Sequence, residues 1–317
     1  MTGPRSAVVF NPTKVDDVDE LRRMVEHGLS GKGWPLPKWY ETTPEDPGRG
    51  QTKEAVKDGA ELIFACGGDG TVMAVVTALA GSDVAMAVLP AGTGNLLAAN
   101  LGLAGDPATG VQVALDGGRR RIDVGVMGDL CFAVMAGMGF DAQMLAGTSE
   151  TAKKHIGWLA YVVGAARHLR DRPMRARIVL DGGRSLPRRP RSVIVGNVGR
   201  LQGGVRLLSK ADPADGKLDV AILSPNNLGH WASLALAVVS RRERVPLMET
   251  FTAERIEIYT KQQEQRQLDG DLIEPGRSMK ISIKPRALLL CVPLPDSDPD
   301  LAYDVTVAKK NAEDLRS

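Results

Sequence analysis

The sequence predicts two domains, an N-terminal open parallel α/β domain followed by a β-rich domain of sandwich type. The chain has 317 residues, which is more than one ordinary compact core needs. Short apolar runs alternate with segments of helical spacing as far as residue 122, which is the pattern of a parallel sheet with helices on both faces. Beyond that point short β-rich runs dominate, which favours a sandwich or a barrel.

The first domain is expected to comprise residues 1–122, with the tail 290–317 packing back onto it. The β-branched run at 6–10 is a strand that ends at Asn11-Pro12, and apolar residues at 18, 21, 25 and 29 have helical spacing. Further strands are expected at 36–41, 61–65 and 84–89, and helices at 15–29, 52–59, 72–80 and 96–101.

The second domain is expected to comprise residues 123–289. The segment 182–191 is rich in arginine, glycine and proline and is expected to be a basic turn or loop. Strands are expected at 122–126, 130–135, 175–180, 192–197, 218–223, 255–259 and 279–283, and helices near 152–169 and 228–240.

Composition excludes several classes of protein. The net charge is only +2, from 40 basic and 38 acidic residues, so nothing indicates nucleic-acid binding. The cysteines, Cys66, Cys131 and Cys291, are scattered, and we expect them to be buried thiols in a reducing compartment. The N-terminus lacks the apolar core of a signal peptide, and the longest apolar run, 228–239, is too short to span a bilayer. These features predict a cytoplasmic protein.

A glycine-rich loop, Gly67-Gly68-Asp69-Gly70-Thr71, lies between an apolar strand and a helix. Glycines let backbone N–H groups approach an anion, and the helix N-terminus adds the positive end of its dipole. Asp69 is expected to orient a loop amide or a metal-bound water, and Thr71 to cap the helix or to bind phosphate. The plainer alternative is a tight turn that Thr71 caps.

A second loop, Pro90-Ala91-Gly92-Thr93-Gly94-Asn95, has the same setting between a strand and a helix. Two such loops at the ends of neighbouring strands predict a ligand site of the kind that open α/β sheets carry. Neither loop has the third glycine of the dinucleotide fingerprint, and the chain has no GxxxxGK[ST] motif.

Asp269-Gly270-Asp271 is the best candidate for a catalytic base, in a polar stretch where a hairpin would present a carboxylate. The alternative is an ordinary Asp-Gly hairpin turn. A second such pair, Asp181-Gly182, has no acidic residue after its glycine.

These motifs occur in the same order as in the diacylglycerol kinase catalytic-domain family, which the chain therefore resembles. This family includes bacterial lipid kinases and sphingosine kinases. The resemblance covers nearly the whole chain. It rests on Asn11-Pro12, the loops at 67–71 and 90–95, and the segments 123–142, 211–220 and 268–271. The family usually continues the first loop with an Asn-Glu pair, where this chain has Met73-Ala74.

The resemblance implies an ATP site in an NAD kinase-like first domain and transfer of the γ-phosphate to a lipid hydroxyl. The base in this family is the acidic residue after the glycine, here Asp271, with Asp269 assisting through a metal or a hydrogen bond. The resemblance adds Asn11 and Thr42 to the nucleotide site, although either is also explained as a loop residue. With ATP it implies Mg²⁺.

Asp212 and Asp215 lie in a turn with the carbonyl of Lys217 nearby, which is a donor set for a hard cation such as Mg²⁺. The resemblance implies a structural metal there, and an Asx turn before the strand explains the residues equally well.

The expected partners are a lipid substrate and an anionic membrane, which the protein contacts transiently, and a homodimer stays open. The membrane elements are expected to be the segment 231–239 with Arg241, Arg242 and Arg244, together with the basic loop at 184–191.

Two other functions stay open. An NAD kinase-like enzyme shares the first glycine-rich loop and takes a soluble nucleotide as acceptor, whereas the second loop and Asp271 favour a lipid. A catalytically silent nucleotide-binding regulator is consistent with Ala74, whereas the intact Asp271 speaks against it.

Overall fold

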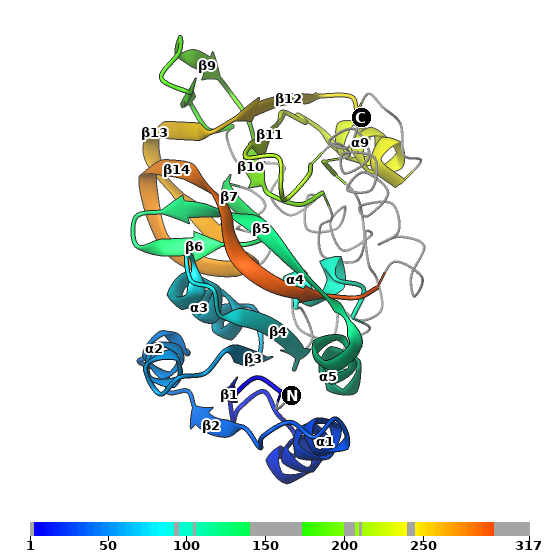
Figure 1. Ribbon diagram of the computed structural model, residues 1–317. Helices are drawn as coiled ribbons and strands as arrows, with labels where there is room; N and C mark the ends of the chain where they lie inside the picture. Colours follow the sequence, from blue (N-terminus) through cyan, green and yellow to red (C-terminus); the bar gives the residue numbers. More distant parts are fainter. Residues whose placement is uncertain are drawn as a thin grey trace, which may run out of the picture. The chain divides into compact units, whose positions relative to one another are not determined.

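The computed structural model describes residues 3–91, 95–103, 106–139, 173–199, 207–208, 211–239 and 245–294 (Figure 1). The chain divides into two compact units, Met1–Ile122 with Leu288–Ser317, and Asp123–Ala287. It passes from the first unit to the second within strand β5 (Gly118–Met127) and returns within strand β14 (Asp271–Val292). The helix expected near 152–169 and the arginines at 241, 242 and 244 lie outside the described residues.

The first unit is built on a parallel sheet in the order β4-β3-β1-β2. Its strands are β1 (Ser6–Phe10), β2 (Lys38–Glu41), β3 (Leu62–Gly67) and β4 (Ala85–Pro90). Every residue of β1, β3 and β4 is buried, because the sheet is covered on both faces and an apolar run satisfies both. The end of β14 adds a parallel partner to β4, with Leu289 opposite Ala85.

Helices cover both faces of this sheet. They are α1 (Val18–Gly31), α2 (Arg49–Lys57), α3 (Asp69–Leu79), α4 (Leu96–Asn100) and α5 (Pro107–Asp116). Helix α1 packs on α5 and α2 packs on α3, and Figure 1 shows these two pairs on opposite sides of the strands. The parallel α/β architecture expected from the sequence is confirmed.

Helices α1, α2 and α3 each begin three residues away from their expected first residue, and α5 is an additional helix. Helix α5 was not expected, although Asp106 caps it by accepting from the N–H of Ala108 and Pro107 occupies its first turn. Helix α2 begins three residues early because the Asp46 carboxylate accepts from the N–H groups of Gly48, Arg49 and Gly50.

The second unit is a mainly antiparallel sheet in the order β12-β11-β10-β7-β13-β14, and β8 and β9 continue from β13. It contains one described helix, α9 (Leu228–Val239). Its strands, besides β5 and β14, are β6 (Leu130–Phe132), β7 (Met135–Gly139), β8 (Ala176–Leu180), β9 (Leu186–Arg188), β10 (Ser192–Gly196), β11 (Leu218–Leu223), β12 (Met248–Ala253) and β13 (Arg255–Leu268).

Several strands of this unit extend beyond their expected bounds. The expected strands at 255–259 and 279–283 are parts of β13 and β14, which pair with each other as far as the turn at Asp269-Gly270. The added stretch is rich in Gln, Glu and Arg, so apolar alternation does not reveal it. The segment expected to be a basic loop contains β9, which pairs with β8.

Candidate active site

The residues expected to bind nucleotide lie at one edge of the parallel sheet. Gly67 pairs with Pro90, so the two glycine-rich loops leave β3 and β4 at the same level. Asn11 follows β1 and Thr42 follows β2, and both strands run parallel to β3. The carboxyl ends of parallel strands are where α/β sheets bind ligands.

Hydrogen bonds tie the two loops to each other. The Asp69 Oδ1 atom accepts from the N–H of Leu96 at 2.6 Å. The Asn95 amide donates to the carbonyl of Gly67 at 3.3 Å, while its Oδ1 caps α4 by accepting from the N–H of Ala98. Asp69 therefore holds the first amide of α4, which directly follows the second loop, and its role toward a ligand stays a prediction. Gly92, Thr93 and Gly94 lie outside the described residues.

The helix begins inside the first loop. Gly68 is the N-cap of α3, and Asp69, Gly70 and Thr71 form its first turn, so Thr71 is not the cap that the sequence suggested. Thr71 is buried against Gly67, where an added Cβ would lie 2.6 Å from the Thr71 Oγ1 atom. A Cβ on Gly68 would have no atom within 4 Å. Gly67 is therefore required for packing, whereas the surface at Gly68 is open for an anion to approach.

Asn11 and Thr42 are both held by β-sheet neighbours. Asn11 donates its N–H to the carbonyl of Cys66, and its Oδ1 accepts from the N–H and the hydroxyl of Thr13. Thr42 is buried and donates its N–H to the carbonyl of Phe10. Their turn roles are thus visible, and their contact with nucleotide stays a prediction.

In the second unit, the turn between β13 and β14 is fixed by the side chain of Asp269. This turn has positive φ at both central residues, 47° at Asp269 and 94° at Gly270, which is the backbone that Asp-Gly favours in a two-residue hairpin. The Asp269 carboxylate accepts from the N–H groups of Ala133, Val134 and Met135 at 2.7 to 2.8 Å. The expected hairpin is present, but the carboxylate of Asp269 points into the domain.

The setting of Asp269 differs from that of Asp271. Asp269 is 2% exposed, and burial raises its pKa to about 6, although the three N–H donors act in the opposite direction. Asp271 is partly exposed, begins β14 and pairs with Leu268 across the turn. Because the carboxylate of Asp269 accepts from three backbone N–H groups, its role is to position the turn. Asp271 is the carboxylate of this turn that is partly exposed to solvent.

Asp269→Asn is expected to lower the free energy of unfolding by about 1–3 kcal/mol, because an amide NH₂ would face a backbone N–H that now donates to a carboxylate oxygen. Asp271→Asn should change it by about 0.5 kcal/mol or less, because Asp271 is partly exposed and lies at the first position of β14. Denaturant unfolding of both variants measures the difference. Equal stabilities would remove the positioning role of Asp269.

The turn at Asp181-Gly182 supports the same division of roles. Asp181 and Gly182 both have positive φ, and the Asp181 carboxylate accepts from the N–H groups of Glu254 and Arg255. The first Asp of each pair thus fixes a turn, and only at 269–271 does a carboxylate follow the glycine.

The residues expected to hold a metal form a hydrogen-bonded turn. Asp212 accepts from the N–H of Ala214, and Asp215 accepts from the N–H of Lys217. Burial, with the nearby charges of Asp212 and Asp123, raises the pKa of Asp215. Throughout the described ranges, no group of three or more His, Cys, Asp or Glu side chains is arranged to hold a metal ion. The Asx turn accounts for the described contacts of Asp212 and Asp215. The negative charges of Asp212 and Asp123 near Asp215 repel one another, and a bound cation would relieve this repulsion.

Two buried polar residues beside this turn were not singled out from the sequence. Asp123 is fully buried and accepts from the N–H groups of Gly216 and Arg286 at 2.7 Å. The Asn197 amide donates to the carbonyls of Asp123 and Ala133. Asp123 is the first residue of the segment 123–142, on which the resemblance partly rests. Its place in that segment is the feature of the sequence that could have indicated its importance.

The comparisons with known proteins now bear on these sites. The family model described as the diacylglycerol kinase catalytic domain matches residues 5–127, and the YegS C-terminal NAD kinase beta sandwich-like domain matches residues 133–292. A probable lipid kinase YegS-like of Pseudomonas aeruginosa (strain UCBPP-PA14) is 32% identical over 255 residues, covering 76% of this chain and 80% of the relative. The chain belongs to the diacylglycerol kinase catalytic-domain family. A diacylglycerol kinase of Mycobacterium tuberculosis (strain H37Rv) is 31% identical over 174 residues, 53% of this chain and 56% of that relative.

Solved structures share the fold of this family member. A putative diacylglycerol kinase from Bacillus anthracis str. Sterne has a TM-score of 0.71 at 19% identity, covering 91% of this chain and 97% of its own. An NAD kinase from Archaeoglobus fulgidus in complex with ATP has a TM-score of 0.50 at 13% identity, covering 90% and 93%. The expected combination of an NAD kinase-like first domain and a sandwich-like second domain is confirmed.

Proposed function

We propose that the protein is an ATP-dependent lipid kinase that transfers the γ-phosphate to the hydroxyl of diacylglycerol or a related lipid. The observation that carries the proposal is the clamped turn at 269–271, where Asp269 is held by three backbone N–H groups and leaves Asp271 as the presented carboxylate. Phosphoryl transfer to an alcohol needs such a group, because the attacking hydroxyl must lose its proton.

The first unit supports the nucleotide half of the reaction. The γ-phosphate carries negative charge that must be held in position, and backbone N–H groups at a helix N-terminus do this without an added side chain. Helix α3 offers its first turn directly after an open glycine, and Asp69 fixes the second loop beside it. Gly68 and Gly70 of the first loop are the proposed phosphate contacts, with Gly92, Thr93, Gly94 and Asn95 of the second.

A lipid acceptor implies that the protein reaches a membrane surface. No helix among the described residues is long and apolar enough to cross a membrane. Helix α9 presents Leu236 with 60% of its surface exposed, which is a suitable side chain for shallow insertion. We therefore propose reversible contact through this helix.

Mg²⁺ is proposed as a partner of the reaction and of the turn at 212–217. There the carboxylates of Asp212 and Asp215, each with one oxygen engaged by a backbone N–H in the turn, would hold the ion with the carbonyl of Lys217. The ion would neutralise the crowded carboxylates and stabilise this turn.

Changing Asp212 and Asp215 together to Asn is expected to lower the midpoint of thermal unfolding in Mg²⁺ but to change it little in EDTA. The reason is that a ligand stabilises only the state that binds it. Differential scanning calorimetry in the two media measures this. An equal loss in both would show that the turn alone needs these carboxylates.

The function itself is tested by incubating the protein with radiolabelled ATP and separate acceptors. The acceptors are diacylglycerol, a sphingoid base, ceramide and a prenol in micelles, together with soluble NAD. We expect phosphate incorporation into one lipid and none into NAD. Labelled NADP would instead establish an NAD kinase, and no labelled acceptor of any kind would favour a nucleotide-binding regulator.

A further inference from the structure

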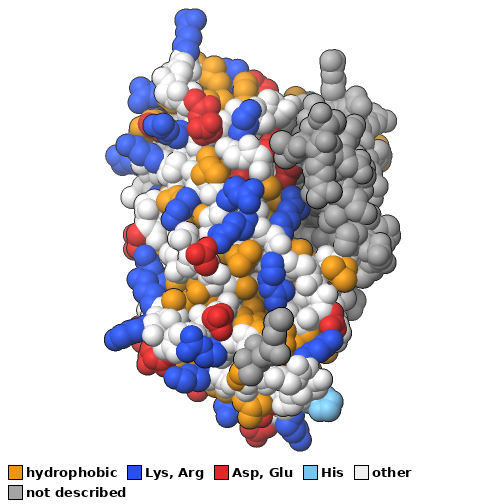
Figure 2. Space-filling view, in the orientation of Figure 1, with side chains coloured by type: hydrophobic (Ala, Val, Ile, Leu, Met, Phe, Trp, Pro, Cys, Tyr) orange, Lys and Arg blue, Asp and Glu red, His pale blue; other side chains and the backbone are white. Residues whose placement is uncertain are grey.

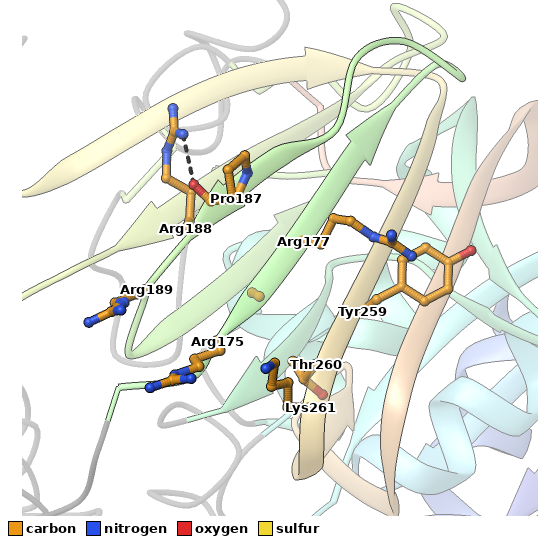
Figure 3. Close-up of a pocket in the computed structure, with 9 residues that line it drawn as sticks. Arg175, Arg177, Pro187, Arg188, Arg189, Tyr259, Thr260 and Lys261 are labelled. Carbon is orange, nitrogen blue, oxygen red and sulfur yellow. Dashed lines mark hydrogen bonds between the residues drawn. The ribbon is translucent and has the colours of Figure 1, made fainter.

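A hollow lies on the exposed face of the piece of sheet formed by β8, β9 and β13 (Figure 3). Its volume is about 620 Å³, and its lining comes from these strands and the residues next to them. The pairing places Tyr259 opposite Arg177, and Arg177 opposite Pro187. Alternation along each strand then puts Arg175, Arg189 and Lys261 on the same face, one step beyond the last pairs.

The three basic residues at this end form an uncompensated row. Like charges on directly opposed strand positions destabilise a sheet. Arg175, Arg189 and Lys261 are exposed, and no described residue makes an ion pair with them. Among the described residues that line the hollow there is no Asp or Glu. A bound anion would relieve this repulsion.

Arg177, which lines the hollow, and Lys280, which is not among its lining residues, both contact the ring of Tyr259. Arg177 stacks on the Tyr259 ring at 5.0 Å, and Lys280 approaches the same ring at 5.9 Å, while the Tyr259 hydroxyl donates to Glu257. Glu257 therefore supplies negative charge beside Tyr259. The residues left to bind an anion are Arg175, Arg189 and Lys261.

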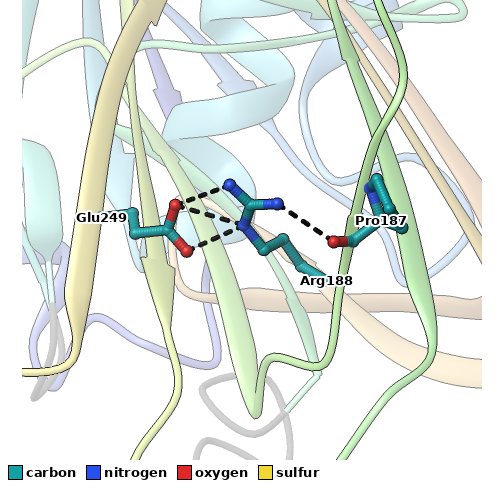
Figure 4. Close-up of polar contacts among 3 residues, drawn as sticks. All are labelled: Pro187, Arg188 and Glu249. Atoms are coloured by element: carbon teal, nitrogen blue, oxygen red, sulfur yellow. Dashed lines mark hydrogen bonds and ion pairs between the residues drawn. The ribbon is translucent and has the colours of Figure 1, made fainter.

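The hairpin that carries one wall is held by an ion pair of Arg188, which is also among the lining residues (Figure 4). Arg188 donates through Nε and Nη2 to both carboxylate oxygens of Glu249 at 2.8 to 3.1 Å, and this partner raises the pKa of Arg188. Because Glu249 belongs to β12, the pair connects β9 to another strand of the sheet. The ion pair therefore restrains the β9 side of the hollow.

We infer that this hollow binds the phosphate-bearing headgroup of an anionic phospholipid. Its volume suits one headgroup, and the net charge of only +2 gives no general attraction for a long polyanion. Figure 2 shows several Lys and Arg side chains over the part of the chain that carries β9 and β13. Arginine and lysine in such a cluster are the usual partners of lipid phosphates.

This inference goes beyond the proposed function, because it concerns binding at a second site without turnover. It is tested without ATP by sedimenting the protein with vesicles of phosphatidylcholine, with and without phosphatidylglycerol. Changing Arg175, Arg189 and Lys261 together to Glu is expected to weaken binding to the anionic vesicles by about 100-fold, since each basic residue near such a surface contributes about fivefold.

The matched control changes Arg23, Lys53 and Lys57 to Glu, which alters the net charge equally at exposed positions of the first unit. It should lose much less than tenfold, because these three residues do not line the hollow and the change acts only through the net charge. Equal losses in both variants would reduce the effect to general electrostatics, and unchanged binding of the first variant would also overturn the inference. Should the Glu variant fail to fold, the same three changes to Gln replace it.

A soluble arm separates the two sources of phosphate. Calorimetry with glycerol 3-phosphate should show no binding at concentrations where vesicles bind, because one phosphate lacks the array of headgroups at a membrane. Tight binding of glycerol 3-phosphate that the triple change abolishes, with vesicle binding unaffected, would identify a site for a soluble phosphate and overturn the lipid assignment.

Discussion

Asp271→Asn is expected to reduce the turnover of a lipid substrate by about 100-fold or more, the scale on which general bases act. The carboxamide has nearly the shape of the carboxylate but does not take a proton from the attacking hydroxyl. The effect should appear in kcat with little change in KM for ATP, since the glycine-rich loops of the first unit are untouched. Steady-state phosphorylation of the lipid found in the acceptor screen measures both constants.

Stability provides the control for this variant. Asp271 begins β14 and is partly exposed, so its replacement by Asn should leave the circular dichroism spectrum and the unfolding midpoint unchanged. Asp181→Asn, at the Asp181-Gly182 turn, gives a second comparison. It removes a carboxylate that accepts hydrogen bonds from two N–H groups and should affect stability without affecting kcat in the folded fraction. Near-normal turnover of the Asp271 variant would transfer the base role to another group.

The candidate site shows what the sequence was able to predict. The spacing of the glycines predicted that two loops lie side by side, because strands that precede such loops end at the same edge of a parallel sheet. The role of Asp269 was not predictable from spacing, since its three N–H partners lie more than 130 residues earlier in the chain. Only the tertiary structure separates it from Asp271.

The fold was predictable where burial leaves a pattern. Strands β1, β3 and β4 are buried throughout and read as apolar runs. Long stretches of β13 and β14 are exposed and carry polar residues, so no apolar pattern predicts these strands. The two strands pair because the turn at Asp269-Gly270 connects them. The expectation that the cysteines are buried thiols is confirmed, since Cys66, Cys131 and Cys291 are all buried and form no disulfide. Burial raises the pKa of the Cys66 thiol to about 12.

Gly68→Val is expected to weaken ATP binding by about 10- to 100-fold while the protein stays folded. Gly68 has φ −80° and ψ −171°, an extended backbone that valine adopts readily, and an added Cβ has no atom within 4 Å. The new side chain would instead occupy the space before the α3 N-terminus, where we place a phosphate. Each charge-assisted hydrogen bond lost there costs about 1.5–3 kcal/mol, which sets the expected range.

A substitution at the neighbouring Gly67 serves as the control, because a side chain there would meet Thr71, whereas one at Gly68 meets no protein atom. At Gly67 a Cβ would lie 2.6 Å from the Thr71 Oγ1 atom, and Thr71 is buried, so Gly67→Ala should destabilise the fold by about 1–3 kcal/mol. Gly68→Val should lose only the preference of glycine over valine as a helix cap, about 1 kcal/mol. Calorimetric titration with ATP, on samples whose unfolding midpoints are measured first, separates the two effects. A folded Gly68 variant that binds ATP as tightly as the parent would mean that phosphate does not approach this turn.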